Sequence, residues 1–326
     1  MRSKRPIHLI TAYLLAPVLF LFMSNTAQAK KRLAEQVGGE AYWILPAPRE
    51  LSPSVFGTPD NPKKLVDPYV QQAKDLVSEK KMPPSVPDLI DPNGPMHGLP
   101  LLVGLPMDGP WGRSMVNGKW TMKHGSPFGD KMMPLKGEDH YFRAKFFDNQ
   151  LTDAKGKTFL DTDDKVAFVS EFTDPQGNHY KVQTLKAFKP PMPGWETQGG
   201  VMMNGEIGGN SGTFIPLIPR AKTHAAFWAI GKITVNDKQP VTHVVVFYIT
   251  EDIRNSQGQM ALDEDMPLNS QGMQAHLLVP PIKPVPGVGP TKKPVPTAFK
   301  LPPKAPKDFQ PFISIYFPNP EFMESF

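Results

Sequence analysis

The sequence predicts a mainly β protein built on an antiparallel β-sandwich-like domain, and three observations support this. Apolar and polar residues alternate over several stretches of strand length, turn signals rich in proline, glycine and aspartate separate these stretches, and helical periodicity is nearly absent. The alternation alone does not decide between a sandwich and an open barrel. With 39 prolines and 26 glycines among 326 residues, dense packing is expected only in the central part of the chain.

The N-terminus has the pattern of a secretory signal peptide. A basic start, MRSKR, precedes an apolar stretch from Leu9 to Met23, and Ala27 and Ala29 fit a signal peptidase site. Cleavage between Ala29 and Lys30 would remove residues 1–29 and leave a periplasmic or secreted chain without a transmembrane span. The absence of cysteine excludes disulfides and a lipidated N-terminal cysteine.

The charge of the chain argues against nucleic acid as a partner. The formal net charge is +5, and the leader carries three of these charges, so the mature chain is only mildly basic. No stretch combines clustered basic residues with stacking aromatics. We therefore expect a protein or a small-molecule ligand as the partner.

Residues 30–135 are expected to form an irregular segment, rich in proline, glycine and methionine, with one short helix. The helix is predicted over about 67–81. Asp67 can cap its start, Pro68 suits the first helical position, and the prolines after residue 82 would end it.

The β-sandwich-like core is expected over residues 136–280, and its central feature is a hairpin. Two apolar runs between His224 and Thr250 flank a polar break, and both faces of each run are largely apolar, so these strands should be covered on both sides. The expected register places Val235 opposite Val241. Gly231 then lies opposite a valine at position 245.

Other strands of the core are predicted from alternation and turn chemistry. One strand begins near His140, and another ends in a turn at 174–177, where proline and glycine favour a type I turn followed by a left-handed residue. The return strand, 179–188, places Tyr180 on the same face as the phenylalanines of the preceding strand, and its other face is polar. A short strand is expected at 275–279.

Residues 281–326 are predicted to be a Pro/Lys-rich arm that ends in a short strand. The composition favours extended polyproline II up to about residue 311. The apolar run 312–317 would be an aggregation liability in solvent. It is therefore expected to dock on its own sheet or on a neighbour's, and the second arrangement would produce an oligomer.

Closely spaced methionine and histidine residues suggest a copper site. Thioether and imidazole groups together suit copper in an exported protein. Methionine also fills irregular cores, which is its commoner use. The candidate ligands are His97, His124, His276, Met96, Met122 and Met273.

Residues Gly209 to Gly212 read G-N-S-G, which resembles the nucleophile turn of chymotrypsin-like serine proteases and would make Ser211 the nucleophile. Thr213 replaces the glycine usual in that motif. The candidate bases, His140 and His179, fall in predicted strands. A glycine-rich turn between strands explains the same residues.

Acidic loops and loop tryptophans offer two further hypotheses. The groups 161–164 and 263–265 could bind calcium, although neither has EF-hand spacing and solvated loop charge explains both. Trp111, Trp120 and Trp195 could stack on a ligand or pack loops onto the sheet. His224 and His243, in apolar strands, are expected to be buried, hydrogen-bonded residues.

These observations favour an exported, non-enzymatic β-sandwich protein of the bacterial cell envelope with a binding or structural role. The first alternative is a periplasmic copper-binding protein. The second is a secreted serine hydrolase that uses Ser211.

Overall fold

The computed structural model describes residues 30–61, 75, 78–79, 113–122, 128–149, 160–190, 195, 198–209, 211, 213, 217–255, 257–262, 269–285, 289–301 and 312–324. The signal peptide and the cleavage site before Lys30 lie outside these ranges. Across the described ranges, no helix is both long enough and apolar enough to cross a membrane.

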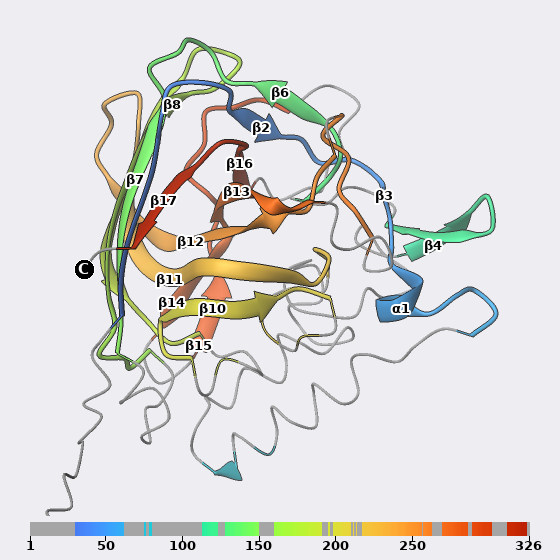
Figure 1. The fold of residues 1–326 in the computed structure, drawn as a ribbon. Coiled ribbons are helices and arrows are strands. Elements are labelled where there is room, and N and C mark those ends of the chain that lie inside the picture. The colour runs from blue at the N-terminus through green and yellow to red at the C-terminus, as the bar shows by residue number, and fades with distance from the viewer. Residues whose placement is uncertain are drawn as a thin grey trace, which may run out of the picture.

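A large antiparallel sheet forms most of the fold (Figure 1). In chain order its strands are β1 (Lys30–Val37), β2 (Tyr42–Ile44), β6 (Met132–Pro134), β7 (Tyr141–Asp148), β8 (Lys165–Thr173), β9 (His179–Ala187), β10 (Val201–Ile207), β11 (Ala221–Val235), β12 (Val241–Asp252), β13 (Asn269–Val279), β16 (Ile313–Phe317) and β17 (Glu321–Glu324). They lie in the order β17-β1-β7-β8-β9-β11-β12-β13-β16-β2-β6, and β10 pairs with β11 outside this path. The prediction of a mainly β, antiparallel fold is confirmed.

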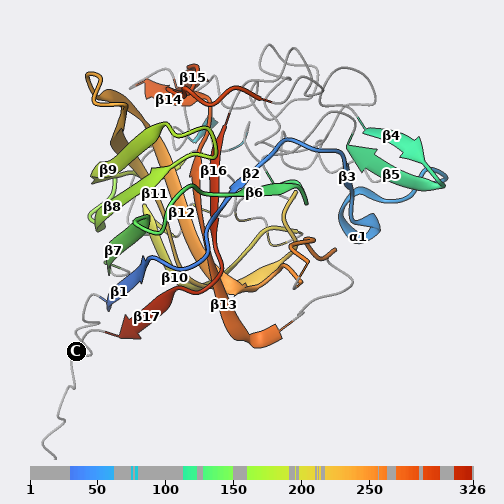
Figure 2. The same ribbon diagram turned by 90° about the horizontal axis from the view of Figure 1, so that it is seen from above.

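Smaller elements accompany this sheet. They are a three-stranded sheet of β3 (Arg49–Glu50), β4 (Arg113–Val116) and β5 (Lys119–Met122), a hairpin of β14 (Ile282–Val285) and β15 (Gly289–Lys292), and the short helix α1 (Pro53–Phe56). Figure 2 shows the small sheet and α1 together on one side of the large sheet.

The large sheet curls so that strands distant in its order face one another. In Figure 1, β1, β7 and β8 run across the direction of β11 and β12. The ring centroid of Phe142 on β7 lies 4.9 Å from that of Phe247 on β12 and 4.9 Å from that of Phe317 on β16. One curled sheet therefore provides facing layers of strands, as in a sandwich.

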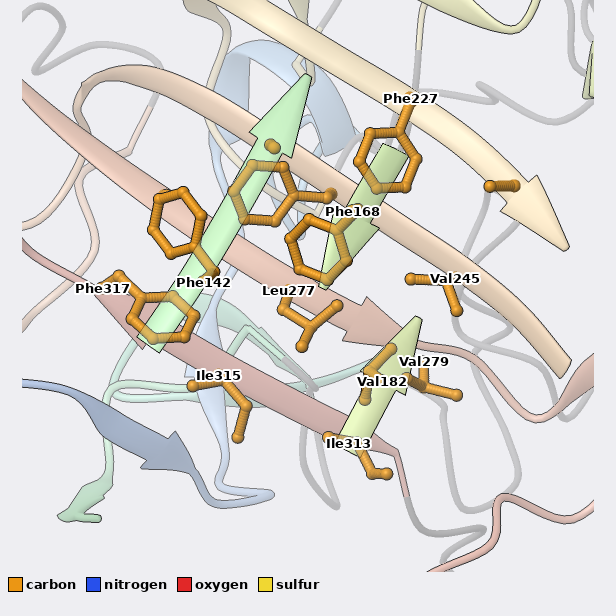
Figure 3. Packing of buried hydrophobic residues seen from close by; sticks show 14 of the residues in the cluster. Phe142, Phe168, Val182, Phe227, Val245, Leu277, Val279, Ile313, Ile315 and Phe317 are labelled. Carbon is orange, nitrogen blue, oxygen red and sulfur yellow. The ribbon is translucent and has the colours of Figure 1, made fainter. Parts of the chain in front are cut away.

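The inner core fills the concave side of this sheet. Figure 3 shows aromatic and aliphatic side chains from its strands converging there. The ring centroid of Phe168 on β8 lies 4.8 Å from that of Phe247 and 5.5 Å from that of Phe227 on β11. Each such buried side chain stabilises the fold by about 1.5–3 kcal/mol.

An outer core covers the opposite face of β11 and β12. Trp228 and Tyr248 are buried there, together with residues of α1, β5 and β10. The strands of the central hairpin are therefore covered on both sides, as predicted from their two apolar faces.

The register of the central hairpin differs from the prediction by two residues. Val241 pairs with Ile233, and Gly231 pairs with His243. The turn closes early because Asn236 and Asp237 both adopt a left-handed conformation, which suits a tight hairpin turn. Residues 238–240 therefore precede the paired part of β12. A shift by two keeps every side chain on its predicted face.

The hairpin of β8 and β9 has the predicted turn. Gly177 is left-handed, with a φ of 92°, and its N–H donates to the carbonyl of Asp174 at 2.9 Å. Phe172 pairs with Tyr180, and both side chains are buried in the inner core. Most residues on the opposite face of β8 and β9 are partly or fully exposed, so the hairpin is half buried.

The stretch expected to be irregular contributes β1 and β2 to the large sheet. β1 pairs with β7 along its whole length. Its buried positions alternate, but Arg32 and Gln36 occupy two of them, which hides the apolar period of a strand. Of the helix predicted over 67–81, Asp75 and Ser78 are helical, and most of the rest lies outside the described residues.

The predicted terminal strand is β16, and it lies in the sheet of its own chain, between β13 and β2. Part of the arm before it also packs on the protein. Phe299 stacks on Trp43 with ring centroids 4.7 Å apart. The hydroxyl oxygen of Tyr180 accepts the N–H groups of Ala298 and Phe299 at 3.0 and 3.1 Å. The arm therefore covers one end of the inner core.

Candidate functional site

A row of aromatic side chains crosses four neighbouring strands on the outer face of the sheet. Tyr248 on β12 pairs with His276 on β13, His276 with Tyr316 on β16, and Tyr316 with Tyr42 on β2. Paired residues lie on the same face, so these four rings form what we call the aromatic ladder. Consecutive ring centroids are 5.1, 5.1 and 6.1 Å apart.

The ladder runs from the core to the surface. Tyr248 is fully buried, Tyr316 is 8% exposed, and Tyr42 is partly exposed. Burial raises the pKa of Tyr316 to about 12 and also raises the pKa of Tyr42. Both hydroxyl groups are therefore protonated at neutral pH and can donate hydrogen bonds.

Arg254 lies against the ladder from the chain that follows β12. Its guanidinium carbon is 5.5 Å from the ring of Tyr316, and the residue is only 4% exposed. Nη1 donates to the carbonyl oxygens of Gly129 at 3.1 Å and Gly258 at 2.7 Å. Within the described part of the chain, Nε and Nη2 have no hydrogen-bond partner. Burial lowers the pKa of Arg254, yet arginine keeps its charge in proteins.

His276 is the buried imidazole of the ladder. It is 1% exposed, and neither ring nitrogen has a hydrogen-bond partner among the described residues. Burial, followed by the charge of Arg254, holds its pKa well below the ordinary value of 6.5. The neutral ring offers one donor and one acceptor.

The next cross-strand pair carries further polar atoms. Thr250 pairs with Gln274, on the same face as the ladder, and both are fully buried. The Thr250 hydroxyl and both amide atoms of Gln274 lack a hydrogen-bond partner among the residues that the structure describes. An unsatisfied buried polar group costs about 1–3 kcal/mol, so water or a ligand is expected to supply partners.

A pocket of about 630 Å³ opens at the outer end of the ladder. This volume is typical of small-molecule sites. Tyr42 and Tyr316 form part of its wall, and Gly258, whose carbonyl holds Arg254, forms another. Its other lining residues are Glu40, Leu45, Asp130, Lys131, Met132, Asn255, Gln257, Pro318 and Asn319.

A second hollow, of about 650 Å³, lies on the exposed outer face of β1, β7, β8, β9 and β17. Leu33, Leu185 and Met323 make much of it apolar. Glu35 and Arg143 at its rim pair with each other at 3.0 Å. The lining residues of neither hollow carry a buried polar atom without a partner among the described residues, but in the first pocket Tyr316 and Gly258 contact Arg254, which carries two such atoms.

The candidate copper ligands that the structure describes do not converge on one centre. Met273 and His276 are three residues apart on β13, so their side chains point to opposite faces of the sheet. Met122 is fully buried in the outer core. Met96, His97 and His124 lie outside the described residues. Among the residues described, no group of three or more His, Asp or Glu side chains could hold a metal.

Ser211 makes its hydrogen bonds within its own turn. Its hydroxyl lies 2.6 Å from the carbonyl oxygen of Gly208 and 2.9 Å from the hydroxyl of Thr213. The histidines considered as bases are engaged elsewhere. Nε2 of His140 lies 2.9 Å from the carbonyl oxygen of Gly39, and His179 lies 3.7 Å from a carboxylate oxygen of Glu171.

Asp164, from the first acidic loop, anchors backbone. Its Oδ2 accepts the N–H groups of Gly200 at 2.7 Å and Val201 at 2.9 Å, and its Oδ1 accepts that of Asn149 at 2.8 Å. These bonds fix the start of β10. The second group, 263–265, lies outside the described residues.

The tryptophans and histidines of the strands mostly serve packing. Trp120 and Trp195 are buried in the outer core, which agrees with packing rather than ligand stacking, and Trp111 lies outside the described residues. His243 is buried as expected, with Nε2 3.3 Å from the carbonyl oxygen of Pro294. His224 is half-buried.

Most of the candidate site was not foreseen from the sequence. His276 was singled out as a metal ligand, whereas Arg254, Tyr42 and Tyr316 were not considered. In the sequence, Ser314 and Tyr316 alternate with the apolar residues of this strand, and this alternation is the one sign that Tyr316 lies on a face of different character. Comparisons with protein-family models, curated proteins and solved structures each find no match to this chain.

Proposed function

We propose that this is an exported, non-enzymatic binding protein of the bacterial envelope, and that its small-molecule ligand occupies the pocket beside Tyr42 and Tyr316. The leader sequence supports export. The binding role depends on one observation: a pocket of ligand size adjoins buried polar atoms that lack hydrogen-bond partners among the described residues.

The groups at this site suit recognition. Ligand pockets combine apolar and aromatic walls with a few fixed polar groups that orient the ligand. The ring of Tyr316 supplies a wall of the pocket. Behind this wall, Arg254 has donors held in place by backbone carbonyls, and His276 has one donor and one acceptor. Fixed groups of this kind bind well because little freedom is lost when the ligand arrives.

Native mass spectrometry of protein isolated from the envelope tests this proposal. Wild type should carry a small-molecule adduct, and Tyr42→Ala should lose most of it because the substitution removes a pocket wall. Tyr141→Ala is the matched control. Like Tyr42, Tyr141 is partly exposed on a strand and donates its hydroxyl to a glutamate at 3.0 Å, but it lies outside the pocket.

The proposal predicts that Tyr141→Ala keeps the adduct at the wild-type level. A wild-type protein that never carries an adduct, or an adduct retained equally by both variants, would show that the pocket is not the binding site.

Copper binding is the competing proposal, and it depends on Met96, His97 and His124. If it holds, Cu(I) should raise the melting temperature, because a ligand that binds the native state stabilises it by mass action. Replacing His97 and His124 together should abolish the shift. An unchanged melting curve of wild type with excess Cu(I) would reject it.

A further inference from the structure

We propose that the ligand of this pocket carries a carboxylate or a similar oxyanion, and that Arg254 binds it through Nε and Nη2. This inference rests on the proposed function. Nη1 is occupied by the carbonyl oxygens of Gly129 and Gly258, which fix the plane of the guanidinium. The unoccupied donors, Nε and Nη2, lie on the same edge of the group, where two parallel N–H bonds match the two oxygens of a carboxylate.

Charge points to the same class of ligand. A buried guanidinium is costly unless a counter-charge accompanies it. In the described ranges, no carboxylate lies within ion-pair distance of Arg254. The charge of Asp130 acts on Arg254 from beyond ion-pair distance, and its Oδ1 accepts the N–H of Met260 at 2.9 Å. A bound oxyanion would supply the missing charge next to the guanidinium.

The pocket lies next to this arginine. Tyr316 lines the pocket and lies under the guanidinium, and Gly258 lines it while holding Nη1. Arg254 itself lies behind this wall, with Nε and Nη2 buried, so a ligand that rests against the tyrosine ring reaches these atoms when Tyr316 or the loop at Gly258 shifts. Tyr42 stacks on Tyr316 with ring centroids 6.1 Å apart, so two aromatic rings contribute to the wall.

The charged residues of the pocket narrow the class of ligand further. Glu40 and Asp130 line the pocket, and Lys131 is the one cationic residue of its lining. Two carboxylates there disfavour a multiply charged anion, because like charges repel. A monocarboxylate with an aromatic body therefore suits the tyrosine rings, the arginine and the acidic lining better than phosphate does.

An NMR titration with sodium benzoate tests the inference, and benzamide is the neutral control of the same shape. The Nε–H signal of Arg254, assigned from its loss in Arg254→Lys, should move with benzoate. The Kd for benzamide should be at least about tenfold higher, since a charge-assisted bond contributes about 1.5–3 kcal/mol. If benzoate leaves this signal in place, or both compounds bind alike, the inference is overturned.

Two variants add a second readout. Arg254→Lys keeps the charge but loses the paired donors, so it should bind benzoate about tenfold more weakly or worse. Arg143→Lys changes an exposed arginine outside the pocket and should bind like wild type. Equal benzoate binding by Arg254→Lys and wild type would contradict the role of Arg254. If Arg254→Lys does not fold, the wild-type comparison of benzoate with benzamide still decides.

Inorganic phosphate distinguishes the sources of the oxyanion. Phosphate that competes with benzoate at similar concentration would support a general oxyanion site, and phosphate that fails to compete would support a carboxylate site. The proposed function is tested separately. A Tyr42-dependent adduct in isolated protein, combined with failure of the benzoate test, would overturn this inference and leave the binding function in place.

Discussion

Gly231 shows how one residue can depend on close packing between neighbouring strands. A Cβ at this position would lie 2.6 Å from a methyl carbon of Val245 and 2.7 Å from the carbonyl oxygen of Gln183, so something must move. We expect Gly231→Val to lower the free energy of unfolding by about 1–3 kcal/mol, the usual effect of overpacking.

Urea unfolding measures this change, and Lys232→Val is the control. Lys232 is the next residue on β11 and is exposed, so the same valine there should cost little. Equal unfolding midpoints for the two variants would mean that the contact with Val245 is not as close as described.

His243 gives the molecule a predicted dependence on pH. Burial, and then the nearby charge of Lys293, lowers its pKa from 6.5 to about 4. Protonation therefore favours the unfolded chain, so this histidine adds stability above pH 6.5 that is lost as pH falls towards 4. The loss should be on the order of 3 kcal/mol, and His276 should act in the same direction.

Unfolding curves between pH 7 and 4 test this expectation. His243→Gln should weaken the dependence on pH, whereas Gln183→Ala, which changes an exposed residue without a titratable group, should leave it unchanged. A dependence that is identical in wild type and His243→Gln would show that His243 does not control it.

Individual elements could be predicted where alternation and turn chemistry agreed. β7, β8, β9 and the central hairpin follow their apolar periods, and Gly177 marks a turn of the predicted type. β1 escaped prediction because Arg32 and Gln36 occupy its inward positions. Arg32 is accommodated there because its guanidinium lies 5.7 Å from the ring of Phe322, a contact between distant parts of the chain.

β16 is the element whose loss should damage the sheet most. It lies between β13 and β2, so truncation after Pro281 would expose the edge of β13 and detach β2 from its neighbour. Lower solubility and a lower melting temperature are expected, because an unpaired, apolar edge promotes aggregation.

Truncation after Pro320 is the control for this experiment. It removes β17, which pairs only with β1 at the end of the strand order, and should be milder. Light scattering of the intact protein should report a monomer, since β16 pairs within its own chain. A dimer that depends on residues 312–317, or a long truncation as stable as the intact protein, would contradict this assignment.

At the scale of the whole molecule, the mature protein is predicted to begin at Lys30. This residue is also the first of β1, where it pairs with Asp148, so the strand would start at the mature N-terminus. Intact mass measurement of protein from the envelope fraction checks the prediction. A full-length mass would show that the leader is retained.

The candidate site could be predicted far less well than the fold. Arg254 stands alone in the sequence, and the carbonyl groups that hold it come from Gly258, four residues on, and from Gly129 in a distant loop. The ladder joins Tyr42 to Tyr316 across most of the chain length. A sequence pattern predicts a strand because the residues of a strand are consecutive in the chain. A site assembled from distant segments leaves no such pattern.

The central claim is that the pocket beside Tyr42 and Tyr316 binds a ligand whose anionic group reaches Arg254. A crystal structure of the protein as isolated from the envelope tests it most directly. The account predicts electron density for a small molecule against the Tyr316 ring, with two oxygen atoms within hydrogen-bonding distance of Nε and Nη2 of Arg254. Density for ordered water alone at both nitrogens, in protein isolated without added ligand, would contradict the claim.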